Sequence, residues 1–191
     1  MSPIMLDETQ IEDIEYLIES FTQEEVRVAI FQMEHNKAPG PDGFPAEFYQ
    51  VFWNIIKEDL MALFTDFHHG NLPLNRLNFG NLILLPKKKD AKVIQQYRPI
   101  CLLNVSFKIF TKVATNRLST VAQRLIRPTQ TTFLLGRNIM EGAVILHETI
   151  HELHSKKKDG VIFKIDFEKA YDKVKWSFLQ QTLRMKGFSE K

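Results

Sequence analysis

The chain has 191 residues, 44% hydrophobic and 25% charged, which is the composition of a folded globular protein and excludes wholesale disorder. No apolar run approaches the roughly 20 residues that a membrane-spanning helix needs, and the acidic start predicts no signal peptide. The single cysteine, Cys101, excludes an internal disulfide framework and a zinc site built from several cysteines.

The net charge of +2 hides an uneven distribution. Residues 1–75 carry 3 Lys and Arg against 14 Asp and Glu, a balance of −11, whereas residues 76–191 carry 22 against 9, a balance of +13. A strongly basic half favours a polyanionic partner, most plausibly a nucleic acid, although a solvated lysine-rich surface would have the same composition.

The first predicted helix begins at Thr22. Thr22 and Glu25 have the spacing of a capping box, and the apolar residues that follow share one helical face. The helix should end before residues 37–43, where two prolines and two glycines exclude regular structure.

A long second helix is expected after Pro45. Its apolar residues keep helical spacing as far as His68 or His69, and Gly70 is placed to end it. Two short apolar runs follow, over residues 81–86 and 100–103, and the first of them predicts a buried strand.

The remaining elements alternate in type. One helix is expected from Asn104 or Ser106 to about Ile126, and another over residues 139–154. Apolar residues alternate with polar ones over residues 161–167, which predicts a strand, and a final helix is expected over residues 176–186, before Gly187.

Two groups of residues have side chains suited to phosphate chemistry. The run Lys87, Lys88 and Lys89 directly follows a predicted strand, and Arg98 precedes a proline that stiffens its backbone. Asp166 lies at the end of the predicted strand 161–167, a place where a rigid element can present a carboxylate to a hard cation such as Mg²⁺.

Five sequence blocks occur in one order along the chain: KAPGPDGF (37–44), LILLPKKKD (82–90), YRPICLLN (97–104), QTTFLLGRNI (130–139) and KIDFEKAYDKVKW (164–176). Together, over roughly residues 20–191, they resemble the reverse transcriptase domain of plant LINE-type, non-LTR retrotransposons. Five blocks in family-like order are more specific than any single motif.

The resemblance implies two-metal nucleotidyl transfer on an RNA template, with a DNA primer, dNTPs and Mg²⁺ or Mn²⁺. Asp166 would be a catalytic aspartate that binds the metals, together with the backbone carbonyl of Phe167. Tyr171 would lie beneath the incoming sugar and exclude a ribose 2′-hydroxyl. The resemblance also implies that the protein is intracellular, either nuclear or cytoplasmic.

The same resemblance assigns the basic residues. Lys87, Lys88, Lys89 and Arg98 would bind the triphosphate from the fingers. A segment between fingers and palm would handle the template through four residues: Gln130, Phe133, Gly136 and Arg137.

The chain departs from the family pattern at several positions. Thr132 stands where the family usually has Gly, and Cys101 where it has Ser. The family's palm continues with an aromatic-x-Asp-Asp hairpin, and no Asp-Asp pair occurs in these 191 residues. We therefore expect weak metal binding and no polymerase activity, because metal affinity follows the number of charged ligands.

The implied fold is α+β, mostly helical with a few short strands: polymerase fingers with a truncated palm. Residues 1–20 are expected to be an acidic extension, residues 21–160 a fingers-like region, and residues 161–191 the first palm strand and helix. The strand 161–167 would then have an exposed edge prone to aggregation or partner binding.

Two other functions fit parts of the sequence. The string His147-Glu148-Thr149-Ile150-His151 has the HExxH spacing of a zinc metallopeptidase, for which His154 and Glu168 are the nearby downstream candidates for a third ligand. The basic half could also belong to a non-catalytic, nucleic-acid-binding remnant, whose binding would be weak, sensitive to salt and independent of sequence.

Overall fold

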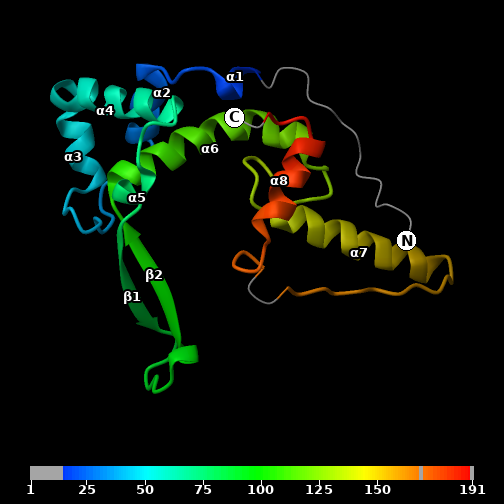
Figure 1. The fold of residues 1–191 in the computed structure, drawn as a ribbon. Coiled ribbons are helices and arrows are strands. Elements are labelled where there is room, and N and C mark those ends of the chain that lie inside the picture. The colour runs from blue at the N-terminus through cyan, green and yellow to red at the C-terminus, as the bar shows by residue number, and fades with distance from the viewer. Residues whose placement is uncertain (1–14, 168–169, 190–191) are drawn as a thin grey trace. The chain divides into compact units, whose positions relative to one another are not determined.

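The computed structural model describes residues 15–167 and 170–189 (Figure 1). In chain order the elements are α1 (Glu15–Ile18), α2 (Gln23–Phe31), α3 (Ala46–Val51), α4 (Trp53–His68), α5 (Leu74–Leu77), β1 (Gly80–Pro86), the 3₁₀ helix η1 (Ile94–Gln96), β2 (Tyr97–Leu103), α6 (Val105–Leu125), α7 (Ile139–Ser155) and α8 (Trp176–Met185). Mostly helical elements with one two-stranded sheet confirm the predicted α+β class.

The chain divides into two compact units. One consists of residues 19–117, and the other of residues 1–18 together with residues 118–191. The division falls inside α6, whose residues therefore belong to both units.

The predicted capping box starts α2. The Thr22 hydroxyl accepts a hydrogen bond from the Glu25 backbone N–H at 3.2 Å, and the Thr22 N–H donates to the Glu25 carboxylate at 2.8 Å. These bonds satisfy backbone donors that the first turn of a helix leaves free.

The long helix predicted after Pro45 is broken at Phe52 into α3 and α4. Phe52 leaves the helical conformation, with φ −95° and ψ 14°. Gly70, which ends the second of these helices, has φ +74°, a conformation that favours glycine.

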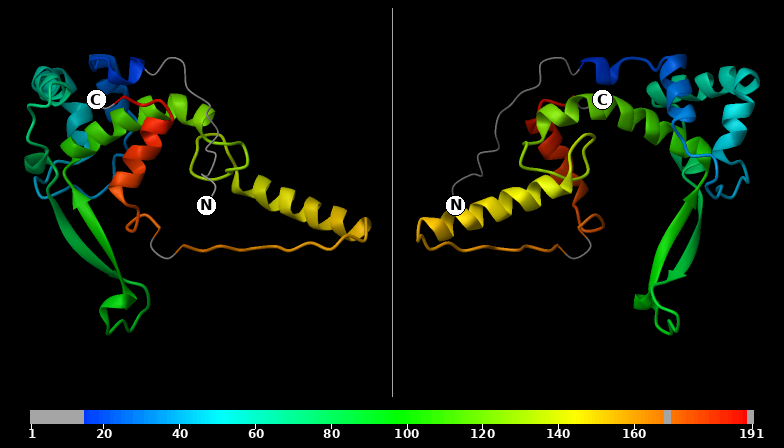
Figure 2. Two further views of the ribbon diagram at one scale, coloured as in Figure 1. Left: turned by 45° about the vertical axis from the view of Figure 1, so that its right-hand side comes forward. Right: turned by 180° about the vertical axis from the view of Figure 1, so that it is seen from behind.

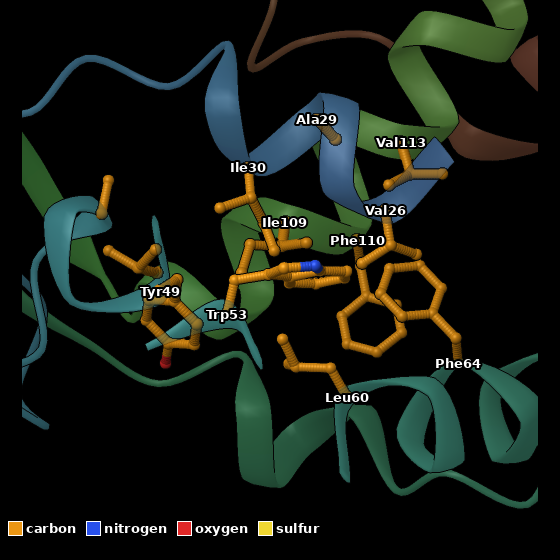
Figure 3. Close-up of a cluster of buried hydrophobic side chains, with 12 residues drawn as sticks. Val26, Ala29, Ile30, Tyr49, Trp53, Leu60, Phe64, Ile109, Phe110 and Val113 are labelled. Carbon is orange, nitrogen blue, oxygen red and sulfur yellow. The ribbon is translucent and has the colours of Figure 1, made fainter. Parts of the chain in front are cut away.

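The core of residues 19–117 lies between α2, α3, α4 and the first half of α6 (Figure 3). Phe64 and Phe110 stack with ring centroids 4.1 Å apart, and Phe21 meets the edge of Phe64 at 5.2 Å. Trp53 and Ile109 are also buried in this cluster. Buried aromatic side chains contribute strongly to the packing of these four helices.

Gln50 and Asn104 hold the connecting segments against this core. The buried Gln50 amide donates to the carbonyls of Ile30 and Met33 at 2.9 and 3.0 Å, which satisfies the end of α2. The Asn104 side chain accepts from the Asp42 N–H at 3.2 Å, and a Cβ added to Gly40 would lie 2.5 Å from the same oxygen. The proline- and glycine-rich loop is thus fixed to the start of α6.

Arg117 is a buried charge on α6 that the sequence pattern did not single out. Its guanidinium donates to the Glu25 carboxylate at 2.7 and 2.8 Å, and to the carbonyls of Glu19 and Ser20 at 2.6 and 2.9 Å. It also lies over the Phe21 ring, 4.2 Å from the centroid. Arg117 therefore connects α6 to the capping box of α2.

The strands β1 and β2 pair antiparallel, from Gly80 opposite Leu103 to Pro86 opposite Tyr97. They project from the helices of their own unit (Figures 1 and 2). The prediction that residues 81–86 form a strand is confirmed, but the prediction of burial is wrong: all six are exposed. A two-stranded ribbon has two open faces, and no third described strand covers either one.

The strand predicted over residues 161–167 is also absent. The backbone there forms no ladder with any part of the chain that the structure describes. Alternation favours a strand only where a partner supplies hydrogen bonds. The helices α7 and α8 match their predictions, and Gly187 follows α8 with φ +91°. None of the described helices is long and apolar enough to cross a bilayer.

Candidate nucleic-acid interface

The β1–β2 hairpin brings the predicted phosphate-binding residues together. Arg98 on β2 lies opposite Leu85 on β1, and Leu85 is two residues before Lys87. The Lys87 N–H donates to the Gln96 carbonyl at 2.7 Å. Lys87, Lys88, Lys89 and Arg98 are all exposed. Residues 80–103 carry five basic side chains against one acidic side chain, Asp90. The end of the hairpin is therefore a cationic surface.

Side chains order the turn that carries these lysines. The Tyr97 hydroxyl donates to the Ala91 carbonyl at 2.9 Å, and the Gln96 side chain accepts from the Lys92 N–H at 2.8 Å. The Lys87 ammonium donates to the Gln95 carbonyl at 2.8 Å. Because these bonds fix the backbone in advance, a phosphate group bound here would not have to order the loop.

Sequence reasoning missed the roles of Gln96 and Tyr97. The signal was weak: Gln96 lies three residues after Val93, the spacing with which a side chain can reach back to cap a short helical turn. Gly80, at the base of the hairpin, is required by close packing, because a Cβ there would lie 2.6 Å from the Cys101 sulfur.

The predicted template-handling residues lie in the loop between α6 and α7. Phe133 is fully exposed and has a positive φ of 64°, and Gly136 has φ +79°. The Gln130 amide donates to the Thr132 hydroxyl at 3.1 Å. A left-handed conformation costs a bulky residue energy, so the surrounding loop must hold Phe133 in place.

Arg137 supplies that restraint. Its guanidinium donates to the carbonyls of Arg127 at 2.6 Å, Gln130 at 2.7 Å, Ile126 at 2.8 Å and Gln123 at 3.3 Å. Most of these carbonyls lie at or just after the end of α6, where a helix leaves acceptors unsatisfied. In this structure Arg137 binds its own chain and positions the loop that carries Phe133.

Replacing Arg137 with Met should loosen this loop. We expect the amides of residues 123–137 to exchange hydrogen at least about tenfold faster, because hydrogen bonds to a charged group contribute about 1.5–3 kcal/mol each. Hydrogen–deuterium exchange measured by mass spectrometry checks this. Arg124→Met, on an exposed residue of the same helix end, is the matched control and should leave exchange unchanged. Equal exchange in parent and Arg137→Met would show that the four bonds do not restrain the loop.

The predicted metal and sugar contacts lie elsewhere along the chain. Asp166 and the largely exposed Phe167 are in the segment that forms no ladder, and Tyr171 is 93% exposed. The described residues contain no group of three His, Cys, Asp or Glu side chains able to hold a metal ion. Asp166 and the Phe167 carbonyl thus do not make a complete metal site by themselves.

The zinc metallopeptidase alternative depends on the HExxH string in α7. His147, Glu148, His151 and His154 are exposed along α7, and no third ligand joins the two histidines among the residues that the structure describes. Glu168, the other candidate ligand, lies outside those residues. Within the part of the chain that the structure describes, the HExxH string is a helical pattern without a third zinc ligand.

Comparison with known proteins shows which family the chain resembles. The family model described as "Reverse transcriptase (RNA-dependent DNA polymerase)" matches residues 85–191. The chain is 34% identical over 168 residues, or 87% of its length, to the 149 kDa protein of transposon TX1 from Xenopus laevis. It is 28% identical over 150 residues, 78% of its length, to the Pol polyprotein of the type-1 retrotransposable element R2 from Nasonia vitripennis.

A third relative is similar over most of the chain. The Pol polyprotein of the type-2 retrotransposable element R2DM from Drosophila melanogaster is 24% identical over 174 residues, 91% of the chain. The chain spans only 13% to 16% of the length of these three relatives. The resemblance to non-LTR retrotransposon proteins is confirmed, and the plant origin stays a prediction.

Proposed function

We propose, from the premise that the chain belongs to the reverse transcriptase (RNA-dependent DNA polymerase) family, that its β1–β2 hairpin binds the phosphates of an RNA template, a DNA primer and a dNTP. The observation that carries this proposal is the gathering of Lys87, Lys88, Lys89 and Arg98 at one exposed hairpin end. Ammonium and guanidinium groups attract phosphate without regard to base sequence.

The chain corresponds to part of a reverse transcriptase domain of the non-LTR retrotransposon type. We assign residues 21–160 to the fingers and residues 161–191 to the first part of the palm. In this assignment Gln130, Phe133 and Gly136 handle the template, and Arg137 positions them. Tyr171 would discriminate against a ribose 2′-hydroxyl.

Reverse transcriptases use divalent metal ions, and Asp166 with the Phe167 carbonyl is where this chain would contribute ligands. One carboxylate and one carbonyl are too few to hold two divalent cations, because affinity rises with the number of charged ligands. We therefore assign the chain a part in nucleic-acid and nucleotide binding, and no complete catalytic centre of its own.

The 191-residue chain should not extend a primer. We expect no incorporation of labelled dNTP on a primed RNA template with Mg²⁺ or Mn²⁺ above the level of a reaction without protein, because Asp166 belongs to no cluster of metal-binding side chains among the residues that the structure describes. Asp166→Ala is the control and should give the same result as the parent chain. Incorporation by the parent that Asp166→Ala abolishes would contradict this assignment.

A non-catalytic, nucleic-acid-binding role is the second candidate. The same cationic hairpin supports it. The two candidates separate when the rest of a related reverse transcriptase palm is supplied as a second polypeptide. Primer extension that then depends on Asp166 supports a polymerase part, whereas binding without extension supports the non-catalytic role.

A further inference from the structure

The junction of α3 and α4 carries an exposed apolar patch. Phe44, Phe48 and Phe52 form a ladder, with ring centroids 4.5 Å apart for the first pair and 5.0 Å for the second. Val51 and Ile55 flank Phe52 along the chain and are 66% and 74% exposed. We call these five residues the aromatic corner.

Four of the five residues of the aromatic corner lie outside the core of their unit, and only Phe48 contacts it. The core instead contains other side chains of the same helices, among them Tyr49 and Trp53, and the Trp53 ring points into the buried cluster in Figure 3. Phe48 packs partly against that cluster, which anchors the ladder, while Phe44 and Phe52 remain exposed. A contiguous exposed patch of large apolar residues marks an interaction surface more often than chance exposure does.

Acidic side chains surround the aromatic corner. Glu47 lies within α3, next to Phe48, and Glu58 and Asp59 lie one turn beyond Ile55 on α4. Asp42 precedes Phe44 and accepts a hydrogen bond from its N–H at 3.1 Å. Residues 42–59 contain these four carboxylates and one basic side chain, Lys57, and all four acidic residues are exposed.

We propose that the aromatic corner binds a basic amphipathic helix of a partner protein. The ladder would receive large apolar side chains spaced at one turn of the partner helix, and the carboxylates would pair with lysines or arginines on its flanks. The acidic surroundings repel phosphate, so this surface is not part of the nucleic-acid interface proposed for the hairpin. The proposal does not depend on polymerase activity.

Two synthetic helical peptides of roughly 16 residues test this. Both carry the same Leu and Phe stripe, and their flanks are Lys in one peptide and Glu in the other. Fluorescence anisotropy with the full chain should show micromolar binding of the Lys peptide and at least about tenfold weaker binding of the Glu peptide. Val51→Gln with Ile55→Gln, which removes apolar contact without changing charge, should weaken binding of the Lys peptide at least about tenfold.

Two further variants distinguish binding at the aromatic corner from non-specific binding to exposed apolar residues. Leu82→Gln with Ile94→Gln alters two exposed apolar residues of the hairpin region, also without changing charge, and should leave binding of the Lys peptide unchanged. Glu47→Lys with Glu58→Lys should reverse the preference between the peptides.

Three results would overturn the proposal: equal binding of both peptides, binding that survives the Val51 and Ile55 changes, or no binding at about 100 μM chain. Sedimentation that shows a concentration-dependent dimer lost on Val51→Gln with Ile55→Gln would also overturn it, because the occupant would then be a second copy.

Discussion

Replacing Arg117 with Met is expected to lower the free energy of unfolding of residues 19–117 by about 3–5 kcal/mol. The change leaves the Glu25 carboxylate without its buried counter-ion and removes the donors to the Glu19 and Ser20 carbonyls. Arg117 is only 4% exposed, so water cannot replace these hydrogen bonds without opening the packing between α6 and α2.

Urea denaturation followed by tryptophan fluorescence can measure the loss of unfolding free energy in residues 19–117. Trp53 is buried in the core of residues 19–117, and Trp176 is 75% exposed, so a Trp176→Phe background makes fluorescence report the first unit. Arg27→Met is the matched control: Arg27 forms an exposed pair with Glu24 at 3.6 Å, and its loss should cost about 1 kcal/mol or less. A cost for Arg117→Met no larger than that of Arg27→Met would refute the role given to this residue.

Lowering the pH should remove part of the stabilisation that the Arg117–Glu25 pair provides. The hydrogen bonds from Arg117 lower the pKa of Glu25 from 4.5 to about 2. Because the folded pKa lies below the unfolded one, the stabilisation is complete above pH 4.5 and is lost as the pH falls through 2. The shift corresponds to about 3 kcal/mol. Glu25→Gln should remove this share of the pH dependence, measured as the difference in unfolding free energy between parent and variant. A constant difference across that range would contradict the linkage.

Neutralising the hairpin should weaken nucleic-acid binding by at least about tenfold. The variant Lys88→Gln, Lys89→Gln, Arg98→Gln removes three exposed positive charges and leaves the Lys87 bond within the turn intact. Each lost phosphate contact removes counter-ion release from the binding free energy. Fluorescence anisotropy with a labelled primed RNA template measures the effect.

The control for this variant has the same change in charge. Lys156, Lys157 and Lys158 are a second exposed lysine run in the basic half, and their replacement with Gln should have a smaller effect. An equal loss of affinity in the two triple variants would mean that net charge, and not the hairpin, determines binding.

Local features of the fold could be predicted from the sequence because their physics is local. The Thr22–Glu25 capping box, the helix-ending glycines and strand β1 each follow from residues within a few positions of one another. The break at Phe52 could not, because the apolar spacing continues through it and no proline or glycine marks it. The exposure of β1 depends on what packs against it, which an apolar run does not reveal.

Contacts between residues far apart in the chain could not be predicted from the sequence. Arg117 bonds to a carboxylate 92 positions away, and no local pattern connects the two. One signal was present: Arg117 continues the stripe of Ile109 and Val113 at helical spacing, so it is a charge on a core face. Arg137 was assigned to the template by resemblance, and its bonds to the end of α6 depend on a loop conformation that the sequence does not specify.

For the candidate site, the sequence predicted which residues take part, and for the hairpin it also predicted that they act as one group. Lys87 to Lys89 and Arg98 were assigned to one phosphate-binding set, and the strand register brings them to one end of a ribbon. Asp166 and Tyr171 remain assigned by family pattern, because the described residues around them form no metal site.

The proposed function requires that this reverse transcriptase family member binds nucleic acid at the end of the β1–β2 hairpin. A salt titration of the 191-residue chain on a mixed-sequence primed RNA template tests it most directly. Affinity should fall at least about tenfold between about 50 and 200 mM salt, and the slope should become shallower in the Lys88, Lys89 and Arg98 variant. Affinity that does not change with salt, or a slope that the variant leaves unaltered, would contradict the claim.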